Sequence, residues 1–213
     1  MARQIRLVLA SASPARLRTL RAAGLGPEVI ISGVDETAVR ADRVPELVAE
    51  LAEQKAEAVL ARLGRARRST VIIGCDSMLE LDGQPYGKPC TASTAVERWR
   101  QMRGRSGVLH TGHHVILNSP DASARSGRLS TTDRRNAVAA TTVHFAELSL
   151  GEIEAYVATG EPLTVAGAFT LDGLGGAFVT GIEGDHSNVL GVSLPLLRNM
   201  IADLGIPWPL LWR

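Results

Sequence analysis

Short apolar runs alternate with amphipathic segments through the first part of the chain. Residues 5–10 and 70–74 are continuous apolar or β-branched runs, which are typical of buried strands. Residues 13–24 begin with Ser-Pro, an N-cap followed by a first-turn proline, and residues 45–63 place apolar side chains every three or four positions, so both segments predict helices. This alternation of strands and helices predicts an α/β protein.

The middle of the chain has the pattern of hairpins. Residues 78–81 lead into Asp82-Gly83, a strong turn signal between two strands. Long strands are expected at 108–117 and 137–146, separated by a polar stretch, 119–136, that has no apolar periodicity and that we expect to be a mobile loop. The remaining predicted elements are a strand at 27–31 and helices at 93–103, 149–159 and 194–204. We therefore expect one domain over residues 1–213, built on a mixed, twisted sheet with flanking helices.

Composition and charge narrow the class of protein. The 213 residues are 45% hydrophobic and 21% charged, which is typical of a globular chain with a sizeable core. No apolar run approaches the roughly 18 residues of a membrane helix, and the first residues lack the apolar region of a signal peptide. A net charge of +1 gives no general attraction to nucleic acid or anionic membranes. We expect a cytoplasmic protein without nucleic-acid or membrane partners.

The two lysines stand out because every other one of the 23 basic residues is arginine. Lys55 falls in the middle of the apolar stripe of the helix at 45–63, where an ammonium group needs an anionic partner. The alternative is a side chain that extends past the edge of the core. Lys88 follows the predicted hairpin, which returns it toward the end of the strand at 70–74.

Three further positions could support phosphate chemistry. Ser11 and Arg16 lie where a strand leads into a helix N-terminus, a place that favours anions, although Arg16 could equally be solvated. Asp76 directly follows an apolar strand and could be a general base, a metal ligand or only a turn cap. Glu36, in an acidic loop, could supply a second oxygen to a metal or be a plain surface acid.

Eight short motifs, taken in order, resemble the Maf family of nucleoside triphosphate pyrophosphatases, also called septum-formation inhibitor proteins. The motifs are Leu9-Ala10-Ser11-Ala12-Ser13-Pro14-Ala15-Arg16, Val34-Asp35-Glu36-Thr37, Gln54-Lys55-Ala56, Gly74-Cys75-Asp76-Ser77, Gly87-Lys88-Pro89, Gly160-Glu161-Pro162-Leu163, Ala166-Gly167-Ala168-Phe169 and Asn188-Val189-Leu190-Gly191. The resemblance covers nearly the whole chain. It implies a fold similar to inosine triphosphate pyrophosphatases, with two lobes around a cleft, and a homodimer.

The same resemblance implies an activity and roles for individual residues. The family hydrolyses nucleoside triphosphates to the monophosphate and pyrophosphate, by attack of water on the α-phosphorus with a divalent metal, Mg²⁺ first and Mn²⁺ as the alternative. Asp76 matches the proton acceptor and a metal ligand, and Glu36 matches the second metal contact. The positions that match phosphate-binding residues are Ser11, Arg16, Lys55 and Lys88.

Departures from the family pattern fall where the base should be recognised. Ala15 replaces the first of two usual arginines, Ser77 replaces a common threonine, and Thr164-Val165 replaces the usual Asp-Lys. Asp172 replaces a glutamine, and an ionised carboxylate accepts hydrogen bonds without donating any. This change favours a guanine-like base over uracil or thymine. The alternative is that Asp172 caps the turn at Gly173.

Two other functions fit parts of the same pattern. A nucleotide-binding regulator of cell division or septum formation would need the phosphate contacts but no acid to activate water. A sugar-nucleotide transferase would need a second substrate, for which the sequence shows no pocket. The presence of Asp76, Lys55 and Lys88 together favours a house-cleaning pyrophosphatase that acts on surplus or non-standard nucleotides.

Overall fold

One mixed sheet of seven strands organises the molecule. The computed structural model describes residues 5–120 and 130–213. Strand order is β2-β1-β3-β5-β6-β7, with β4 paired to β3; β1 is parallel to both β2 and β3, and all other pairs are antiparallel. The strands are β1 (Arg6–Leu9), β2 (Glu28–Val29), β3 (Thr70–Leu81), β4 (Gln84–Tyr86), β5 (Ser106–Pro120), β6 (Ser130–Phe145) and β7 (Val179–Glu183). The predicted α/β class with a mixed sheet is confirmed.

The five predicted helices are all present, with the expected caps. Ser13 accepts a hydrogen bond at the start of α1, and Ser149 and Glu152 form a reciprocal capping box on α4. The helices are α1 (Pro14–Ala22), α2 (Val44–Leu63), α3 (Ala92–Met102), α4 (Leu150–Ala158), α5 (His186–Val189) and α6 (Leu194–Ala202), with 3₁₀ turns η1 (Glu36–Ala38), η2 (Glu161–Thr164), η3 (Ala166–Ala168), η4 (Leu174–Phe178) and η5 (Trp208–Leu211). Within the described residues, none of these helices has both the length and the apolar character needed to cross a membrane.

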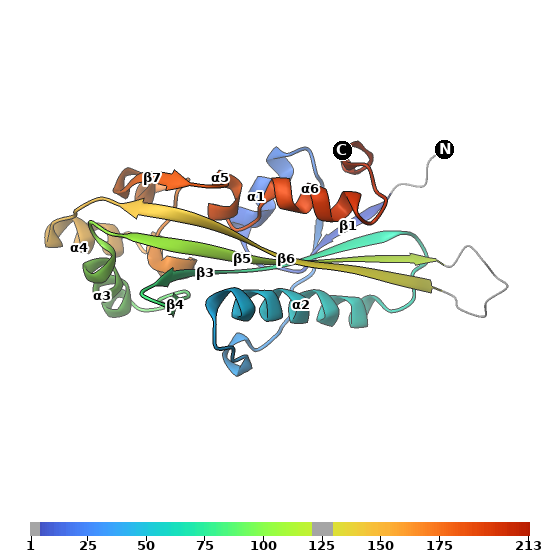
Figure 1. Ribbon diagram of the computed structural model, residues 1–213, viewed down its shortest axis with the longest axis horizontal. Helices are drawn as coiled ribbons and strands as arrows, with labels where there is room; N and C mark the ends of the chain where they lie inside the picture. Colours follow the sequence, from blue (N-terminus) through green and yellow to red (C-terminus); the bar gives the residue numbers. More distant parts are fainter. Residues whose placement is uncertain (1–4, 121–129) are drawn as a thin grey trace.

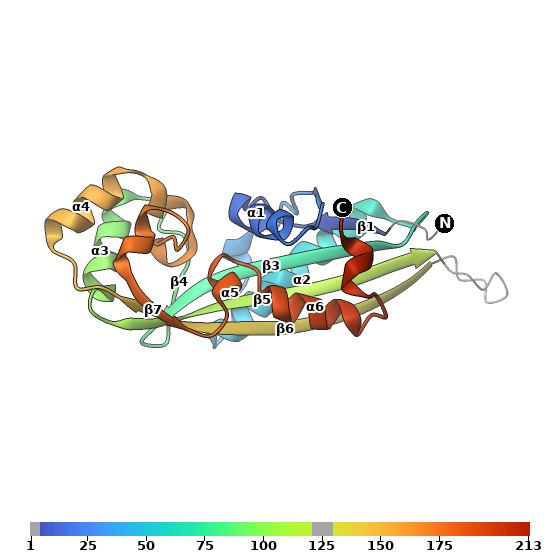
Figure 2. The ribbon, with the colours of Figure 1, turned by 90° about the horizontal axis from the view of Figure 1, so that it is seen from above.

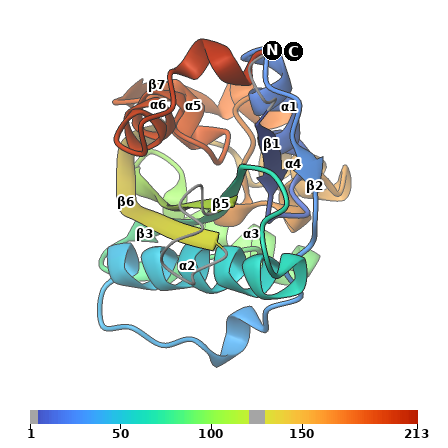
Figure 3. The same cartoon turned by 90° about the vertical axis from the view of Figure 1, so that its right-hand side faces the viewer.

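Helices cover both faces of the sheet. Figure 1 shows α2 along one face, with α1 and α6 on the other, and Figure 3 shows the same layers from the end of the molecule. Alternate residues of β1 separate into the two cores: Leu7 and Leu9 pack with α1 and α6, whereas Val8 packs with α2. At the far end of the sheet, α3 and α4 form a separate group (Figure 2) around an aromatic core in which Trp99 contacts Phe145 edge to face.

The structure differs from the predicted loop at 119–136 at both of its ends. β5 continues to Pro120 and β6 begins at Ser130, so residues 119–120 and 130–136, half of this polar stretch, are paired in the sheet, while residues 121–129 lie outside the described part of the chain. Backbone hydrogen bonds hold a hairpin ladder together whatever the polarity of its side chains. Polar composition was therefore a poor guide to the end of these strands.

Two glycines let α2 lie directly on the sheet. A Cβ atom at Gly74 of β3 would lie 2.2 Å from the carbonyl oxygen of Ala52, and one at Gly112 of β5 would lie 2.1 Å from that of Val48. Both contacts are with helix backbone, which cannot move aside as a side chain can. Only glycine at these positions allows α2 to pack this closely.

His113 of β5 is a buried, neutral side chain that supports the start of α6. Its Nδ1–H donates to the carbonyl oxygen of Thr111 at 3.0 Å, and its Nε2 accepts from the backbone N–H of Ser193, the N-cap of α6, at 2.9 Å. Burial lowers the pKa of His113 from 6.5 to about 4, because the charged ring would lose its hydration.

We expect Gly74→Ala to lower the free energy of unfolding by about 1–3 kcal/mol, because the new methyl group pushes α2 away from the sheet. Urea unfolding measures the change. Gly151→Ala is the matched control: no atom lies within 4 Å of its added Cβ, and it lies in a helix, where alanine is the better residue. Equal or higher stability in Gly74→Ala would contradict the role of close packing.

His113 should make stability depend on pH. Its folded pKa is depressed, so the unfolded chain takes up the proton first, and the stabilisation present above pH 6.5 is lost as the pH falls toward 4. Between pH 7 and pH 4.5 this loss should be about 2–3 kcal/mol. Urea unfolding at both values should show a smaller acid loss in His113→Gln than in the wild type. His186→Gln, at an exposed position, should behave like the wild type.

Candidate active site

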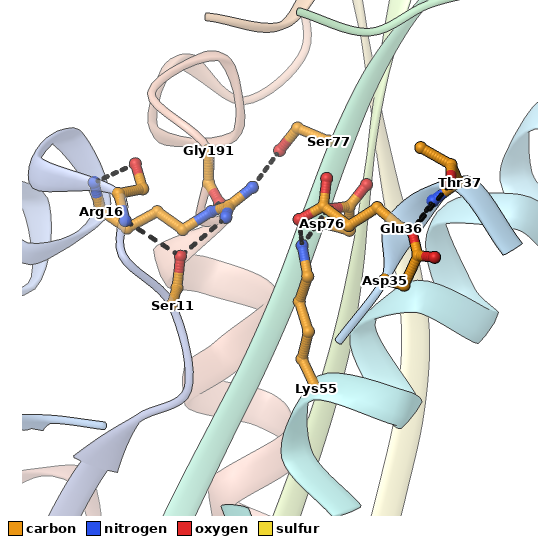
Figure 4. A network of polar contacts seen from close by, with 10 residues as sticks. Ser11, Arg16, Asp35, Glu36, Thr37, Lys55, Asp76, Ser77 and Gly191 are labelled. Carbon is orange, nitrogen blue, oxygen red and sulfur yellow. Dashed lines mark hydrogen bonds and ion pairs between the residues drawn. The ribbon is translucent and has the colours of Figure 1, made fainter. Parts of the chain in front are cut away.

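A buried cluster of charged groups lies where α2 meets β3. Lys55 of α2 is 6% exposed, and its Nζ forms an ion pair with Glu36 at 2.7 Å and another with Asp76, which is also 6% exposed. Figure 4 shows the lysine side chain extending from α2 to both carboxylates. Lys55 therefore has the anionic partners that its position in the apolar stripe requires.

The two-residue period of β3 explains why Asp76 meets Lys55. Ile72 packs with α2, so Gly74 and Asp76, at alternate positions, face the same helix. The expectation that Asp76 follows its strand is wrong: it lies inside β3, because the pairing with β5 continues past it and places it opposite Gly112.

Asp76 nevertheless lies beyond the parallel part of the sheet. The last residue of β1, Leu9, pairs with Ile73, three positions before Asp76. Ser11 follows β1 at the same edge. This edge is the place where open α/β sheets bind ligands.

Glu36 is brought to Lys55 by a short 3₁₀ turn. The side chain of Asp35 accepts from the backbone N–H of Thr37 at 3.0 Å and so caps η1. Burial alone would raise the pKa of Glu36, but the hydrogen bond and charge of Lys55, with smaller effects of Lys88 and Arg16, lower it below its usual value. Glu36 is therefore held as a carboxylate by its contact with Lys55.

Arg16 approaches the same strand from α1, on the other side of β3 from Lys55 (Figure 4). The guanidinium donates from Nη1 to Ser11 Oγ at 3.0 Å and from Nη2 to Ser77 Oγ at 2.8 Å. Its Nε donates to the carbonyl oxygen of Gly191 at 2.7 Å. Three segments far apart in the sequence, around residues 11–16, 77 and 191, are thereby joined beside Asp76.

Charge is unbalanced around Arg16. The residue is 8% exposed, yet the oxygens that accept its side-chain hydrogen bonds are two hydroxyls and one carbonyl, and no carboxylate of the described residues forms an ion pair with it. A buried guanidinium is stable only with compensation for its charge. The site is therefore suited to an anionic ligand.

The remaining candidate residues lie farther out. Lys88, just after β4, is exposed, and its charge contributes to the lowered pKa of Glu36. Asp172 does not belong to this set of contacts: its Oδ2 accepts from Arg18 Nη2 of α1 at 3.0 Å. The backbone N–H groups of Leu174 and Gly175 donate instead to Glu161.

Two contributors were missed in the sequence. Thr111 of β5 lies 2.9 Å from Ser77 through their hydroxyl oxygens, and the carbonyl of Gly191 accepts from Arg16. The strand register that pairs Ser77 with Thr111 would have identified the first. The second is a backbone atom, which no side-chain pattern indicates.

Two carboxylates are placed where they could hold a metal ion. Oxygens of Asp76 and Glu36 both contact the same nitrogen, Lys55 Nζ, so they converge from β3 and η1. No group of three or more His, Cys, Asp or Glu side chains with the arrangement of a metal site occurs in residues 5–120 and 130–213. Mg²⁺ is commonly held by one or two carboxylates together with substrate phosphates, so this pair of residues fits it.

Comparison with known proteins identifies the family. The sequence matches the family of Maf-like proteins over residues 6–204. The chain belongs to the Maf family. Among curated relatives, the nucleoside triphosphate pyrophosphatase of Salinispora tropica is 58% identical over 98% of this chain and 88% of its own length. The protein of the same name from Streptomyces coelicolor is 54% identical over 97% of this chain and 94% of its own length. That from Saccharopolyspora erythraea is 51% identical over 98% of this chain and 97% of its own length.

We expect Lys55→Met to destabilise the protein by about 3 kcal/mol at pH 7, because Asp76 would remain buried without its counter-charge. Thermal or urea unfolding measures the change. Lys88→Met removes the only other lysine from an exposed position and should leave stability nearly unchanged. Equal changes in stability in Lys55→Met and Lys88→Met would show that the buried ion pairs of Lys55 do not stabilise the protein.

Proposed function

We propose that this chain hydrolyses nucleoside triphosphates to the monophosphate and pyrophosphate at the Asp76 cluster. The observation that supports this most directly is Arg16, a buried guanidinium surrounded by neutral oxygens and positioned beside a buried acid. A polyphosphate would supply the missing negative charge. The names of the curated relatives agree with this activity.

The cations are placed to bind and polarise the phosphates. Arg16 extends from α1 and Lys55 from α2, so positive charge reaches β3 from two sides. Ser11 and Ser77, whose hydroxyls accept from Arg16, would exchange part of these contacts for phosphate oxygens. Lys88, which is exposed near Glu36, would meet the outer phosphates. Fixed positive charge of this kind stabilises the pyrophosphate as it leaves.

Asp76 is the proton acceptor in this proposal. A water molecule attacks the α-phosphorus, the bond from that phosphorus to the oxygen bridging the α- and β-phosphates breaks, and pyrophosphate leaves with the electron pair. The proton of the water passes to the Asp76 carboxylate. Lys55 holds this carboxylate in place, and Lys55 is in turn held by Glu36.

A divalent metal fits the same carboxylates. Asp76 and Glu36 would hold Mg²⁺, or Mn²⁺ in its place, and the bound ion would neutralise phosphate charge and orient the substrate. Lys55 would then remain as the cation behind the two acids. Family resemblance also leads us to place the enzyme in the cytoplasm as a homodimer.

Asp172 provides the preference for the base. It presents a carboxylate rather than the amide usual in the family, and it lies on the segment opposite α1, paired with Arg18. A carboxylate accepts two donors at once, such as the N1–H and amino group of guanine. We therefore expect guanine-type nucleotides to be preferred to UTP and dTTP.

Pyrophosphate release from GTP, ATP, UTP and dTTP with Mg²⁺ tests the proposed reaction. Asp76→Asn should lower kcat by about 10²–10⁴-fold, because the amide cannot accept the proton. Asp82→Asn is the matched control: it makes the same chemical change at an exposed hairpin residue whose left-handed backbone, with φ +53°, also suits asparagine.

Nucleotide binding without pyrophosphate release in the wild type would contradict the proposal and favour the regulatory function. Equal loss of activity in Asp76→Asn and Asp82→Asn would contradict the role given to Asp76. Mg²⁺ removal with a chelator should abolish turnover and leave the unfolding transition in place, since Lys55 already pairs with both carboxylates that would hold the ion.

A further inference from the structure

Arg18 and Asp172 form an ion pair between two distant parts of the chain. Arg18 lies on α1, and Asp172 precedes η4, 154 positions later; Nη2 donates to Oδ2 at 3.0 Å. The side chains are 64% and 37% exposed. Exposed pairs contribute little to stability, so the importance of this one lies in where it places its charges.

The backbone around Asp172 is held by a single carboxylate. Glu161 accepts from the backbone N–H of Leu174 at 3.1 Å, from that of Gly175 at 3.0 Å, and from the hydroxyl of Thr170. The Glu161 carboxylate also lies close to Gly173, where an added Cβ would be 2.7 Å from its Oε2. Residues on both sides of Asp172 are thus hydrogen-bonded to one side chain.

α1 connects this pair to the phosphate site. Arg16, two positions before Arg18, donates to Ser77, the neighbour of Asp76. One helix therefore carries both the arginine of the catalytic cluster and the arginine that pairs with Asp172, although the two side chains leave α1 on different sides. The role proposed above for Asp172 in recognising the base places the base beside Arg18.

We propose that Arg18 is a specificity residue that acts with Asp172 to select a 6-keto purine. Within the described residues, Asp172 Oδ1 receives no hydrogen bond, so the carboxylate can accept from N1–H and the 2-amino group. The guanidinium retains donors that its bond to Asp172 does not use, and one of them can donate to the 6-keto oxygen. This inference rests on the proposed function and extends it to a residue outside the motifs.

Other bases match this pair of side chains less well. Adenine presents an amino group where Arg18 also offers a donor, and its N1 cannot donate to Asp172. Uracil has one N–H between two keto oxygens, so it would present an oxygen to the Asp172 carboxylate where guanine presents its amino group. Hypoxanthine keeps the keto oxygen and N1–H, so it separates the contribution of Arg18 from that of the 2-amino contact.

The test compares kcat and KM for GTP, ITP, ATP and UTP in Arg18→Met, Asp172→Asn and the double variant. Arg18→Met should lower kcat/KM for GTP and ITP by about tenfold or more relative to ATP, mainly through KM. Arg18→Lys keeps one donor and should retain part of the preference. Asp172→Asn should lower kcat/KM for GTP more than kcat/KM for ITP. The double variant should have a kcat/KM for GTP close to that of the single variants, because the two residues act together.

Arg21→Met, one turn farther along α1 at an exposed position, is the matched control and should not change the ranking of the bases. An unchanged ranking in Arg18→Met, with pyrophosphate still released, would overturn this inference and leave the proposed function intact. If the wild type released no pyrophosphate, the proposed function would fail. The order of preference among the four nucleotides would then be measured from their Kd values by calorimetry. An order that is the same in Arg18→Met as in the wild type would again contradict the role given to Arg18.

Discussion

The close contact of α2 with the sheet determines where the charged cluster can form. Gly74 and Gly112 leave no Cβ between helix backbone and strands, so the helix lies near enough for Lys55 to reach a strand residue. A larger side chain at either glycine would move the ammonium away from Asp76. Lys55 and Asp76 depend on one another, because both are buried and a buried charge is stable only with a partner, whereas Glu36 approaches the lysine from an exposed position.

The two buried cations of the site, Lys55 and Arg16, are held in place independently of each other. Lys55 is fixed by the core beneath α2, whereas Arg16 is fixed by hydroxyl and carbonyl oxygens on the opposite face of the sheet. Lys55 is neutralised by carboxylates and Arg16 is not. The charge of Lys55 is thus neutralised within the folded protein, whereas the charge of Arg16 remains available to an anionic ligand.

Sequence patterns predicted the helices well because their signals are local. The Ser-Pro start of α1 and the capping box of α4 are complete within a few residues. The burial of Lys55 and its need for an anionic partner followed from helical periodicity, but the sequence did not identify Asp76 as that partner, because Asp76 was expected beyond the end of its strand rather than inside β3. The length of β5 and β6 was not predictable in this way, since pairing between strands, rather than side-chain polarity, keeps residues 130–136 in the sheet. Arg18 was also missed, because only the folded chain brings α1 beside Asp172.

The bond from Arg16 to the carbonyl of Gly191 spans 175 positions of the chain. During synthesis Ser11 and Ser77 emerge long before Gly191, so two of the three partners of the guanidinium are made early and the third is made near the end of translation. The last contact fixes Nε and joins the segment before α6 to α1. The full set of bonds that orients Arg16 therefore exists only in the nearly complete chain.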